Sequence, residues 1–384
     1  MVHRFRTAAV LLTAVVVVSM LMVTCREKQP GEIRMGVIVP LTGAAADFGK
    51  WAHNGVDLAI TDLGQQPPEK GRSYKAVYED HQMDTKLGLS AFKKLVDVDK
   101  VDGVITAGSG VVLAIAPEAD RTHVLQMNYA AVSPAIRKAG PYTFTLVNDG
   151  DIETDEIARL AYQTLGIKQM AIVYANASYG VGTKDAMTRS FSHIGGQVID
   201  SIAFPENFAD IRAQLTRLKS LNPPAVYFIA TIKDSGRLLK QAGELGVKTQ
   251  WLTYNAFESP EVINIAGDAA EDVIYTSSNL FDLPNPGGKA EQFLQTYIMK
   301  YGERPNLYAA TAYDAVQLLA LAHASSDGTG EGLQRYLASL KDYEGVSGVI
   351  TFDEDGSVRK PVFLKVVRHG QFILYKPTGG NEKQ

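Results

Sequence analysis

Short apolar runs that alternate with amphipathic helical segments are the feature that most restricts how this chain can fold. In the middle of the sequence, five runs rich in β-branched and aromatic residues begin 23 to 28 residues apart, near Gln169, Gln197, Ala225, Thr249 and Asp272. Each interval is long enough for one strand, one helix and two short turns. Parallel strands need crossovers of that kind, and helices then cover both faces of the sheet. The spacing therefore predicts an α/β domain built on a parallel sheet.

A first block with the same alternation precedes this one. Ile33–Val39 is a continuous apolar run, which suits a strand buried on both faces. The helix expected next, over 49–62, places Ala52 and Val56 on one face. The other strands expected in this block are Tyr74–Glu79, Val101–Thr106, Val124–Tyr129 and Tyr142–Val147. Because a single core rarely grows past about 250–300 residues, two such blocks in a chain of 384 residues predict two lobes.

The last part of the chain contains both kinds of element again. Helices are expected over 288–301, 306–324 and 330–340, followed by a short strand, Val349–Phe352. The expected closing hairpin has Pro361–Val367 and Phe372–Tyr375 as its strands and turns at His369-Gly370. No internal repeat is strong enough to predict a solenoid.

The N-terminus has the pattern of a secreted protein. Two arginines precede the uncharged run Ala8–Val23, which is an n-region followed by an h-region and is short of the ~20 residues that a membrane span needs. The run ends at the only cysteine, Cys25, and resembles a bacterial lipobox, although Thr24 departs from the usual small residue. We predict a lipoprotein signal peptide over 1–24 and a polar tether over 25–31; an uncleaved anchor or a chance cysteine is the alternative. The lipidated protein would lie at the periplasmic or extracellular face of a membrane.

Composition and motifs argue against several classes of function. The formal charge is −4, whereas nucleic-acid-binding domains usually carry a basic patch. The seven histidines are scattered, and Cys25 lies outside the expected fold, so neither a metal site nor a Cys/His nucleophile is indicated. Gly108-Ser109-Gly110 lacks the third glycine of a dinucleotide loop, and Gly180–Lys184 lacks the spacing of a phosphate loop. Turn acids such as Asp80 and Asp84 fit no calcium loop. The sequence predicts no metal, no cofactor and no nucleic-acid partner.

Five segments, taken in order, carry a resemblance to a known family. They are Gly36–Gly43 with Phe48-Gly49, Tyr78–Asp84, Tyr174–Gly180, Ile265–Glu271 and Gly348–Gly356. Together they resemble the branched-chain amino-acid type of periplasmic solute-binding protein, the type I fold that serves ABC importers. The resemblance covers nearly all of the chain from Ile33 to Tyr375.

This resemblance implies two doubly wound parallel-sheet lobes joined by three hinge crossings. The crossings would fall near Val147–Asp149, Thr276–Ser278 and Ser347–Thr351. The implied lobes are 32–147 plus 279–348 for lobe 1 and 148–278 plus 349–378 for lobe 2. A small organic solute would bind between the lobes, where helix N-termini converge at the carboxyl ends of the strands. Hinge closure would then present it to an ABC permease, and such proteins generally work as monomers.

The residues matched to the family's ligand site depart from those of amino-acid binders. Such relatives grip the α-carboxylate with hydroxyl side chains and backbone N–H groups of lobe 1, and they neutralise the ammonium with an acid of lobe 2. Our matching puts Val112 and Val132 at the hydroxyl positions and Asn255 at the acid. A buried ammonium without a compensating charge is strongly disfavoured, so the pocket disfavours an amino acid. A shifted register would bring in Ser109 and Ser133 and restore the hydroxyls.

The other contact candidates lie at strand ends and in first turns of helices. They are Phe48, Trp51, Gly110, Ala131, Tyr179, Thr231 and Phe257. Tyr179 matches a ligand-stacking tyrosine of the family, whereas Trp51 reads equally as a residue packed inside lobe 1. The expected ligand is a small apolar or aromatic acid, keto acid or amide, which Asn255 would read through either end of its amide. The alternatives are a branched-chain amino-acid binder, a ligand-sensing receptor component, and an enzyme, for which no nucleophile–base pair or cofactor loop is found.

Overall fold

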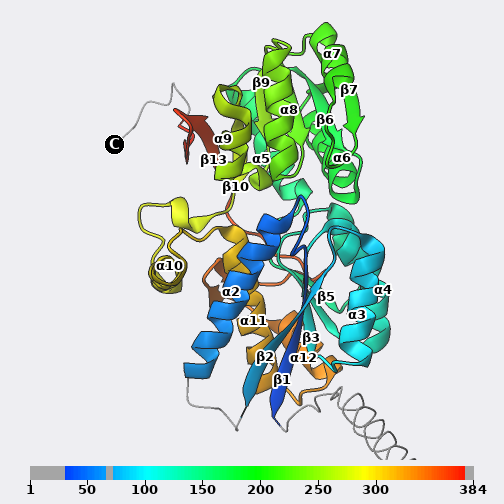
Figure 1. Cartoon of the computed structure of the whole chain (residues 1–384), viewed down its shortest axis with the longest axis vertical. Helices are drawn as coiled ribbons and strands as arrows, with labels where there is room; N and C mark the ends of the chain where they lie inside the picture. Colours follow the sequence, from blue (N-terminus) through cyan, green and yellow to red (C-terminus); the bar gives the residue numbers. More distant parts are fainter. Residues whose placement is uncertain (1–30, 66–71, 377–384) are drawn as a thin grey trace, which may run out of the picture.

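Two lobes stacked along the long axis make up the molecule, and each has its own sheet and its own apolar core (Figure 1). The computed structural model describes residues 31–65 and 72–376. The expected signal peptide over 1–24, Cys25 and all of the expected tether except Gly31 lie outside the described residues. Within the described ranges, no helix has both the length and the hydropathy that a membrane span requires.

Lobe 1, the lower lobe in Figure 1, is built on a five-stranded parallel sheet in the order β2-β1-β3-β4-β5. Its strands are β1 (Glu32–Val39), β2 (Ser73–Asp80), β3 (Gly103–Thr106), β4 (Leu125–Asn128) and β5 (Thr143–Thr145). Its helices are α2 (Ala46–Gln65), α3 (Thr85–Asp97), α4 (Ser109–Thr122), the 3₁₀ turn η2 (Pro134–Lys138), α10 (Gly288–Tyr301), α11 (Leu307–Ser325) and α12 (Gly330–Ser339). A small antiparallel pair, β11 (Tyr343–Gly345) and β12 (Gly348–Ile350), follows α12.

Helices cover both faces of this sheet, with α3 and α4 on one side and α2 and α11 on the other (Figure 1). The close approach of α2 to α11 depends on Gly55, where a Cβ atom would come within 2.1 Å of the Ala309 carbonyl oxygen. β1 is buried along seven of its eight residues, as its continuous apolar run predicts.

Lobe 2 has a seven-stranded sheet in the order β14-β13-β10-β9-β8-β6-β7, of which the two C-terminal strands are antiparallel. Its strands are β6 (Gln169–Ala175), β7 (Gln197–Phe204), β8 (Ala225–Ile229), β9 (Gln250–Thr253), β10 (Ile274–Ser277), β13 (Phe363–Arg368) and β14 (Gln371–Leu374). Its helices are α5 (Gly150–Arg159) with a π-helical end η3 (Leu160–Thr164), α6 (Ser178–His193), α7 (Arg212–Leu221), α8 (Ile232–Glu244) and α9 (Pro260–Ala266). Short 3₁₀ turns are η4 (Asn255–Phe257), η5 (Gly267–Ala270) and η6 (Leu280–Asp282). Each strand expected from the sequence has a counterpart, so the two-lobed α/β fold is confirmed.

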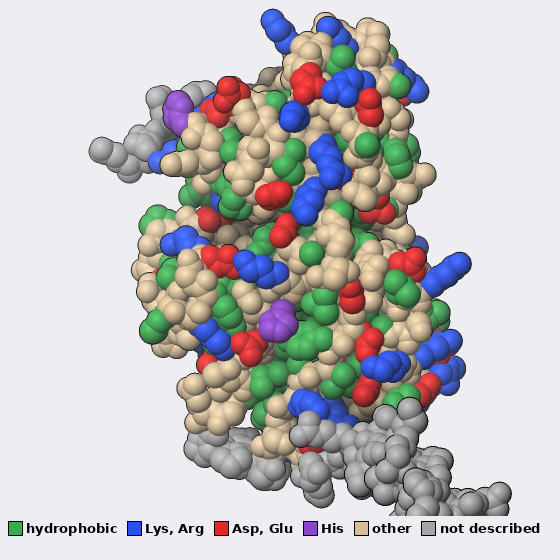
Figure 2. Space-filling view, in the orientation of Figure 1, with side chains coloured by type: hydrophobic (Ala, Val, Ile, Leu, Met, Phe, Trp, Pro, Cys, Tyr) green, Lys and Arg blue, Asp and Glu red, His purple; other side chains and the backbone are tan. Residues whose placement is uncertain are grey.

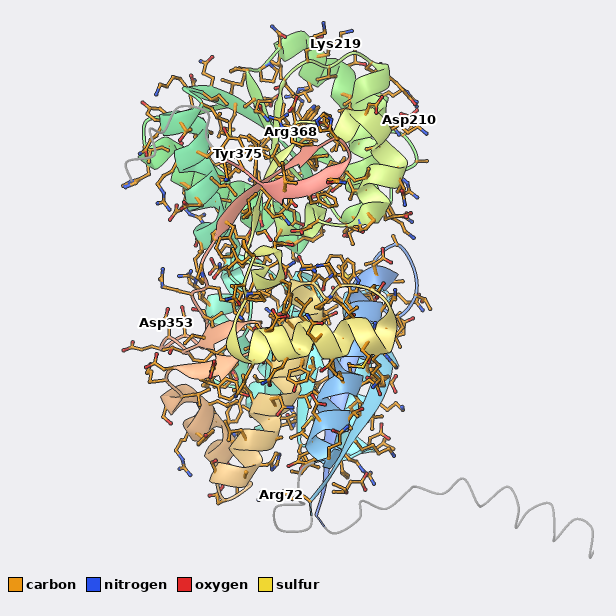
Figure 3. All side chains as sticks on the ribbon, turned by 90° about the vertical axis from the view of Figure 1, so that its left-hand side faces the viewer. Arg72, Asp210, Lys219, Asp353, Arg368 and Tyr375 are labelled. Atoms are coloured by element: carbon orange, nitrogen blue, oxygen red, sulfur yellow. The ribbon has the colours of Figure 1, made fainter. Side chains whose placement is uncertain are left out.

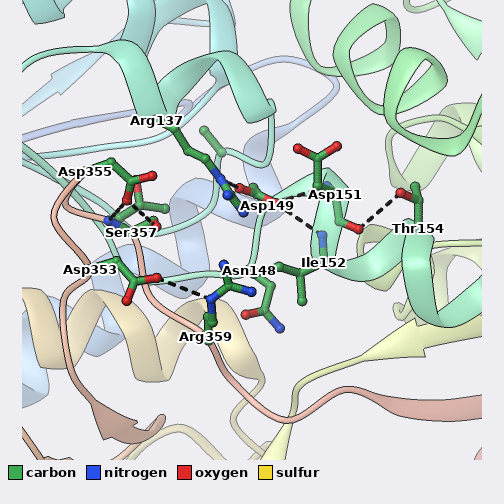
Figure 4. A network of polar contacts seen from close by, with 12 residues as sticks. Arg137, Asn148, Asp149, Asp151, Ile152, Thr154, Asp353, Asp355, Ser357 and Arg359 are labelled. Carbon is green, nitrogen blue, oxygen red and sulfur yellow. Dashed lines mark hydrogen bonds and ion pairs between the residues drawn. The ribbon is translucent and has the colours of Figure 1, made fainter. Parts of the chain in front are cut away.

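Three segments connect the lobes, and one side chain joins all three. Asn148 in the first crossing donates from Nδ2 to Ser278 Oγ at 3.1 Å and to the Lys360 carbonyl oxygen at 2.9 Å, and its Oδ1 accepts the Lys360 backbone N–H at 2.8 Å. Ser278 and Lys360 belong to the second and third crossings. The next residue, Asp149, caps α5 and pairs with Arg137 of lobe 1 (Figure 4). The hydrogen bonds of Asn148 therefore hold the three crossings together at one point.

The third crossing lies later in the chain than the expected Ser347–Thr351. Phe352 and Val358 are buried in the core of lobe 1, because their apolar side chains fill that core rather than the core of lobe 2. Figure 3 shows Asp353 on the lower lobe and Arg368 on the upper lobe. Lobe 2 resumes only at β13, which pairs with β10.

Two buried opposite charges anchor this third crossing to lobe 1. Lys360 donates from Nζ to the carbonyl and the hydroxyl of Ser347. Asp314 of α11 accepts the backbone N–H groups of Val346 and Ser347, each at 2.9 Å, and the Ser347 hydroxyl. Burial lowers the pKa of Lys360 to about 8 and raises that of Asp314, while each charge opposes the shift of the other. Each charge thus stabilises the other, and removing one of them would lower the free energy of unfolding.

Candidate functional site

A cavity lies between the lobes at the carboxyl ends of their strands. Its volume is about 50 Å³ open to the centres of water molecules, enough for about four waters. Lobe 1 lines it with Pro40, Phe48, Met83, Ala107, Gly108, Ser109, Ala130, Ala131, Val132 and Tyr308. Lobe 2 lines it with Tyr179, Thr231, Tyr254 and Ala256. None of these lining side chains, among the residues that the structure describes, carries a charge.

The lobes touch around this cavity. A Cβ atom at Gly182 of α6 would come within 2.7 Å of Ser133 Oγ in lobe 1. A Cβ atom at Gly110 would lie 3.3 Å from Ser178 Oγ, in the first turn of α6. The structure therefore has its lobes closed on each other, and small residues on both sides allow the close approach.

The lobe-1 wall is formed by the N-terminus of α4. Gly108 precedes the helix at φ +81°, a left-handed conformation that favours glycine. The N–H groups of the first turn have no partners within the helix and attract negative charge. Ser109 Oγ accepts the Ser133 backbone N–H at 3.2 Å, which leaves the Ser109 proton for another acceptor. This wall offers donors to an anionic group.

The lobe-2 wall presents two hydroxyl groups that lack a close hydrogen-bond partner. Tyr179 lies in the first turn of α6, and Thr231 is the N-cap residue of α8. Both side chains are more than nine-tenths buried, and neither Tyr179 Oη nor Thr231 Oγ1 has a partner at close hydrogen-bond distance, although the carboxyl groups of Glu206 and Asp234, respectively, lie near enough to interact with them. A ligand could therefore supply a closer hydrogen-bond partner to these two hydroxyls, whereas the Tyr254 hydroxyl already donates to the Ala230 carbonyl oxygen.

Two acids lie close to the lobe-2 wall without lining the cavity. Partial desolvation raises the pKa of Glu206, which is exposed, and burial raises that of Asp234, which also accepts the Asn207 backbone N–H at 2.8 Å. Burial, together with Tyr254 and the charges of the two acids, raises the pKa of Tyr179 well above its ordinary value. The Tyr179 hydroxyl is therefore neutral and able both to donate and to accept.

Aromatic rings close the side of the cavity next to α2 and α11. Phe48 and Tyr308 line it, with ring centroids 4.9 Å apart and edge-on to each other. Trp51 stacks on Tyr308 at 5.9 Å and does not reach the cavity. Of the two interpretations of Trp51 from the sequence, the structure agrees with packing inside lobe 1 and not with contact to a ligand in the cavity.

Half of the predicted contact residues line the cavity and half do not. Those that line it are Phe48, Ser109, Ala131, Val132, Tyr179 and Thr231. Those that do not are Trp51, Gly110, Val112, Ser133, Asn255 and Phe257. Val112 is buried beneath the wall against Ala131 and Ile136. Phe257 packs inside lobe 2 on Phe228 and Tyr275. Gly110 and Ser133 face α6 of the other lobe.

Asn255 has both ends of its amide engaged by protein groups. Its Nδ2 donates to Glu153 Oε1 at 2.5 Å, and its Oδ1 accepts the Tyr308 hydroxyl at 2.8 Å. Thr276 donates to the other Glu153 oxygen. Burial raises the pKa of Glu153 to about 7, against the hydrogen bonds that lower it. Sequence reasoning missed Glu153, although it lies four residues before Ile157 on the apolar face of α5.

The surface around the cleft carries no strong charge of one sign on the face drawn in Figure 2. There, Lys and Arg side chains are interspersed with Asp and Glu over both lobes. No group of three His, Cys, Asp or Glu side chains in the described part of the chain is arranged to hold a metal ion. The groups that line the cavity are hydroxyls, backbone N–H groups and apolar side chains.

Three comparisons with known proteins find the same kind of relative. A family model described as "Periplasmic binding protein" matches residues 32–371. A Leu/Ile/Val-binding protein homologue of Brucella abortus is 24% identical over 339 residues, which cover 87% of this chain and 89% of that protein. The crystal structure of a leucine binding protein from Thermotoga maritima has a TM-score of 0.83 and 26% identity, with coverage of 90% and 98%. A solute binding protein of Rhodopseudomonas palustris in complex with 3,4-dihydroxy benzoic acid has a TM-score of 0.79 and 23% identity, with coverage of 91% and 99%.

Proposed function

Since the chain belongs to the periplasmic binding protein family, as an ABC-transporter solute-binding protein of the Leu/Ile/Val-binding kind, we propose that its solute is a small carboxylic acid with an apolar or aromatic body. Proteins of this family bind solutes and catalyse no reaction. Keto acids and simple amides of the same size belong to the proposed class, whereas zwitterionic amino acids do not. Closure of the lobes over the acid would present it to a permease.

The observation that carries this proposal is the absence of a charged side chain from the described lining of the cavity. An ammonium group buried there would find no counter-charge among the lining residues, which is unfavourable. At the position matched to the family's acid stands Asn255, and its amide is already bonded to Glu153 and Tyr308. The site is therefore poorly suited to the positive end of an amino acid.

A carboxylate, by contrast, has a partner on each wall. The first turn of α4 and the Ser109 hydroxyl offer donors from lobe 1, and helix N-termini favour anions without any basic side chain. The hydroxyls of Tyr179 and Thr231, which line the cavity, offer two more polar groups from lobe 2. The apolar or aromatic body of the acid would lie between these two sets of polar groups, in contact with Phe48 and Tyr308.

A branched-chain amino acid is the second candidate, because two observations favour it. The named relatives include Leu/Ile/Val-binding and leucine binding proteins. Glu206 and Asp234 lie close enough to Tyr179 for their charges to raise its pKa. An ammonium that displaced or bridged the Tyr179 hydroxyl would be drawn towards Glu206.

A thermal-shift screen of the purified protein, unfolded and refolded to remove bound solute, tests both candidates. The panel contains the amino acids together with aliphatic, keto and aromatic acids and simple amides. A compound at 100 times its Kd adds about 2.7 kcal/mol, enough to raise the Tm by a few degrees in a chain of this size. A shift with benzoate or a keto acid and none with leucine supports the proposal.

The variant Glu206→Gln separates the two candidates when more than one compound binds. A shift with leucine that Glu206→Gln abolishes supports the amino-acid candidate and contradicts the proposed class. Benzoate binding is expected to be unchanged in the same variant, because no charge pairs with it there. A panel in which no carboxylate gives a shift also contradicts the proposal.

The membrane anchor at Cys25 and the monomeric state stay predictions. Cys25→Ser is expected to move the protein from the membrane fraction to the soluble fraction of the cells that export it. Retention of the variant in the membrane fraction would instead favour an uncleaved N-terminal anchor.

A further inference from the structure

We propose that Asn255 and Tyr308 form a latch between the lobes, and that Glu153 positions Asn255 for it. This inference rests on the proposed function, because a solute-binding protein works by opening and closing its lobes. It assigns to Asn255 a role in closure rather than in reading the ligand.

The latch is a chain of short contacts from one lobe to the other. Tyr308, in the first turn of α11 in lobe 1, donates its hydroxyl proton to Asn255 Oδ1 at 2.8 Å. Asn255, just after β9 in lobe 2, donates from Nδ2 to Glu153 Oε1 at 2.5 Å. The exposed fractions of Tyr308, Asn255 and Glu153 are 4%, 5% and 2%. Water therefore does not compete for these groups while the lobes are closed.

Glu153 determines which way the Asn255 amide points. The two groups that face the Glu153 oxygens, Asn255 Nδ2 and the Thr276 hydroxyl, both donate, so the carboxyl group acts there as an acceptor. Its Oε1 therefore faces the Nδ2 group of Asn255, which turns Oδ1 towards lobe 1. Thr276 donates to the second oxygen of Glu153 and holds the carboxylate in place. Without this acceptor, no contact in lobe 2 would favour the amide orientation in which Oδ1 faces Tyr308.

The other half of the latch is held rigidly by ring contacts. Tyr308 stacks on Trp51 with an interplanar angle of 11° and lies edge-on to Phe48. Its hydroxyl therefore has one direction available, across the cleft. Opening the lobes separates α11 from β9 and must break this bond, so the bond adds to the stability of the closed state only.

Tyr254 supplies a matched control within the same cavity. It also lines the cavity and is buried, but its hydroxyl donates to the Ala230 carbonyl oxygen within lobe 2. Tyr308→Phe and Tyr254→Phe each remove one phenol oxygen from a cavity-lining ring. Only Tyr308→Phe removes a bond between the lobes.

The test measures lobe closure by single-molecule fluorescence in the protein without any solute. Labels are attached to cysteines placed at two exposed lysines, Lys93 of α3 and Lys240 of α8, in a Cys25→Ser background. We expect Tyr308→Phe to shorten the lifetime of the closed state about fivefold, which corresponds to about 1 kcal/mol. Tyr254→Phe is expected to leave that lifetime unchanged.

Variants of Glu153 test the positioning role. Glu153→Gln keeps an acceptor oxygen for Asn255 and is expected to close like the wild type, whereas Glu153→Leu is expected to match Tyr308→Phe. The double variant Glu153→Leu/Tyr308→Phe should be no worse than either single variant, because both act through one bond. A purely structural role of Glu153 predicts additive losses instead.

Three outcomes would overturn the latch. They are a wild-type protein that never visits the closed state without solute, equal effects of Tyr308→Phe and Tyr254→Phe, and additive losses in the double variant. Because no solute is present, these results do not depend on which compound the protein binds. Binding of leucine in the thermal-shift panel would contradict the proposed ligand class and leave the latch standing.

Discussion

The hinge side and the cleft side of the lobe interface are built from different chemistry. On the hinge side, Asn148 joins the three crossings, and Lys360 with Asp314 buries two charges. On the cleft side, small residues and aromatic rings face each other, and one phenol–amide bond joins Tyr308 to Asn255. Buried charges are costly to separate, whereas apolar contacts and one neutral hydrogen bond are not. The comparison teaches that stability and ligand affinity can be altered separately in this molecule.

A second buried cation supports the same contrast. Lys365 of β13 is 1% exposed and pairs with Glu258 and with Asp282, the latter at 2.7 Å. Asp282 follows the second crossing, and Lys365 follows the third. The ion pairs of Lys365 therefore connect the second and third crossings, in addition to the hydrogen bonds of Asn148.

The largest expected effect comes from breaking the hinge side. Lys360→Met removes the cation that faces Asp314 and leaves a buried carboxylate without a counter-charge, which costs about 3–5 kcal/mol of unfolding free energy. Lys50→Met is the matched control, because Lys50 pairs with Glu303 on the exposed surface, and exposed pairs contribute less than about 1 kcal/mol. Urea unfolding of both variants checks the prediction. Equal losses would show that the hinge charges have no special importance.

The next effect is a dependence of stability on pH that arises on the cleft side. Burial raises the pKa of Glu153 from 4.5 to about 7 in the folded protein. Folding thus favours the protonated acid, so the contribution of Glu153 to stability is fully present below pH 4.5 and is lost as the pH rises from 4.5 to about 7. A shift of this size corresponds to about 3 kcal/mol. Urea unfolding between pH 4.5 and 7.5 measures the slope.

Glu153→Gln is expected to flatten that slope without abolishing it. Burial raises the pKa of Glu258 to about 7 as well, although Lys365 opposes the rise. The part of the slope that the variant removes therefore reports Glu153, and the remaining slope reports Glu258 together with the other acids whose pKa is raised, among them Asp314 and Asp234. A variant with the wild-type slope would contradict the assignment to Glu153.

Removing the aromatic wall of lobe 2 tests the cleft side directly. Tyr179→Ala deletes a buried ring and its hydroxyl from the cavity, and we expect the Kd of the bound acid to rise about 100-fold, equivalent to about 2.7 kcal/mol. Tyr162→Ala, in the same lobe but away from the cavity, is the control. Isothermal titration measures both, and an unchanged Kd in Tyr179→Ala would falsify the site assignment.

The smallest expected effect comes from the lobe-1 wall. Ser109→Ala removes one hydroxyl but keeps the N–H groups of α4, so the Kd should rise about tenfold, the value of one hydrogen bond to a charged group. The free energy of unfolding should also fall by about 1–3 kcal/mol, because the buried Ser133 backbone N–H loses the acceptor that Ser109 Oγ provides. Tighter or unchanged binding would place the carboxylate elsewhere in the cavity.

Much of the fold was predictable because its strands are encoded locally. Ile33–Val39 is apolar at nearly every position, and a parallel strand covered on both faces requires such a run. The third crossing was misplaced for a long-range reason. Val349–Phe352 reads as a strand, but only the packing of Phe352 against Phe144 shows that it belongs to lobe 1.

The site was predictable at the strand ends and less so behind them. Ser109, Tyr179 and Thr231 each follow a strand directly, so topology alone places them at the cleft. Glu153 lies within a helix whose sequence contains four acids and reads as solvent-facing. Its burial depends on Asn255, about 100 residues later, and no local pattern encodes that contact.

The late return of the chain has a consequence for how the protein unfolds. The core of lobe 1 is completed by α11 and α12, and the sheet of lobe 2 by β13, so neither lobe is a continuous piece of sequence. A single proteolytic cut therefore cannot separate the two lobes with each of them complete. The protein is therefore expected to melt in a single cooperative transition, and limited digestion is expected to yield no stable isolated lobe.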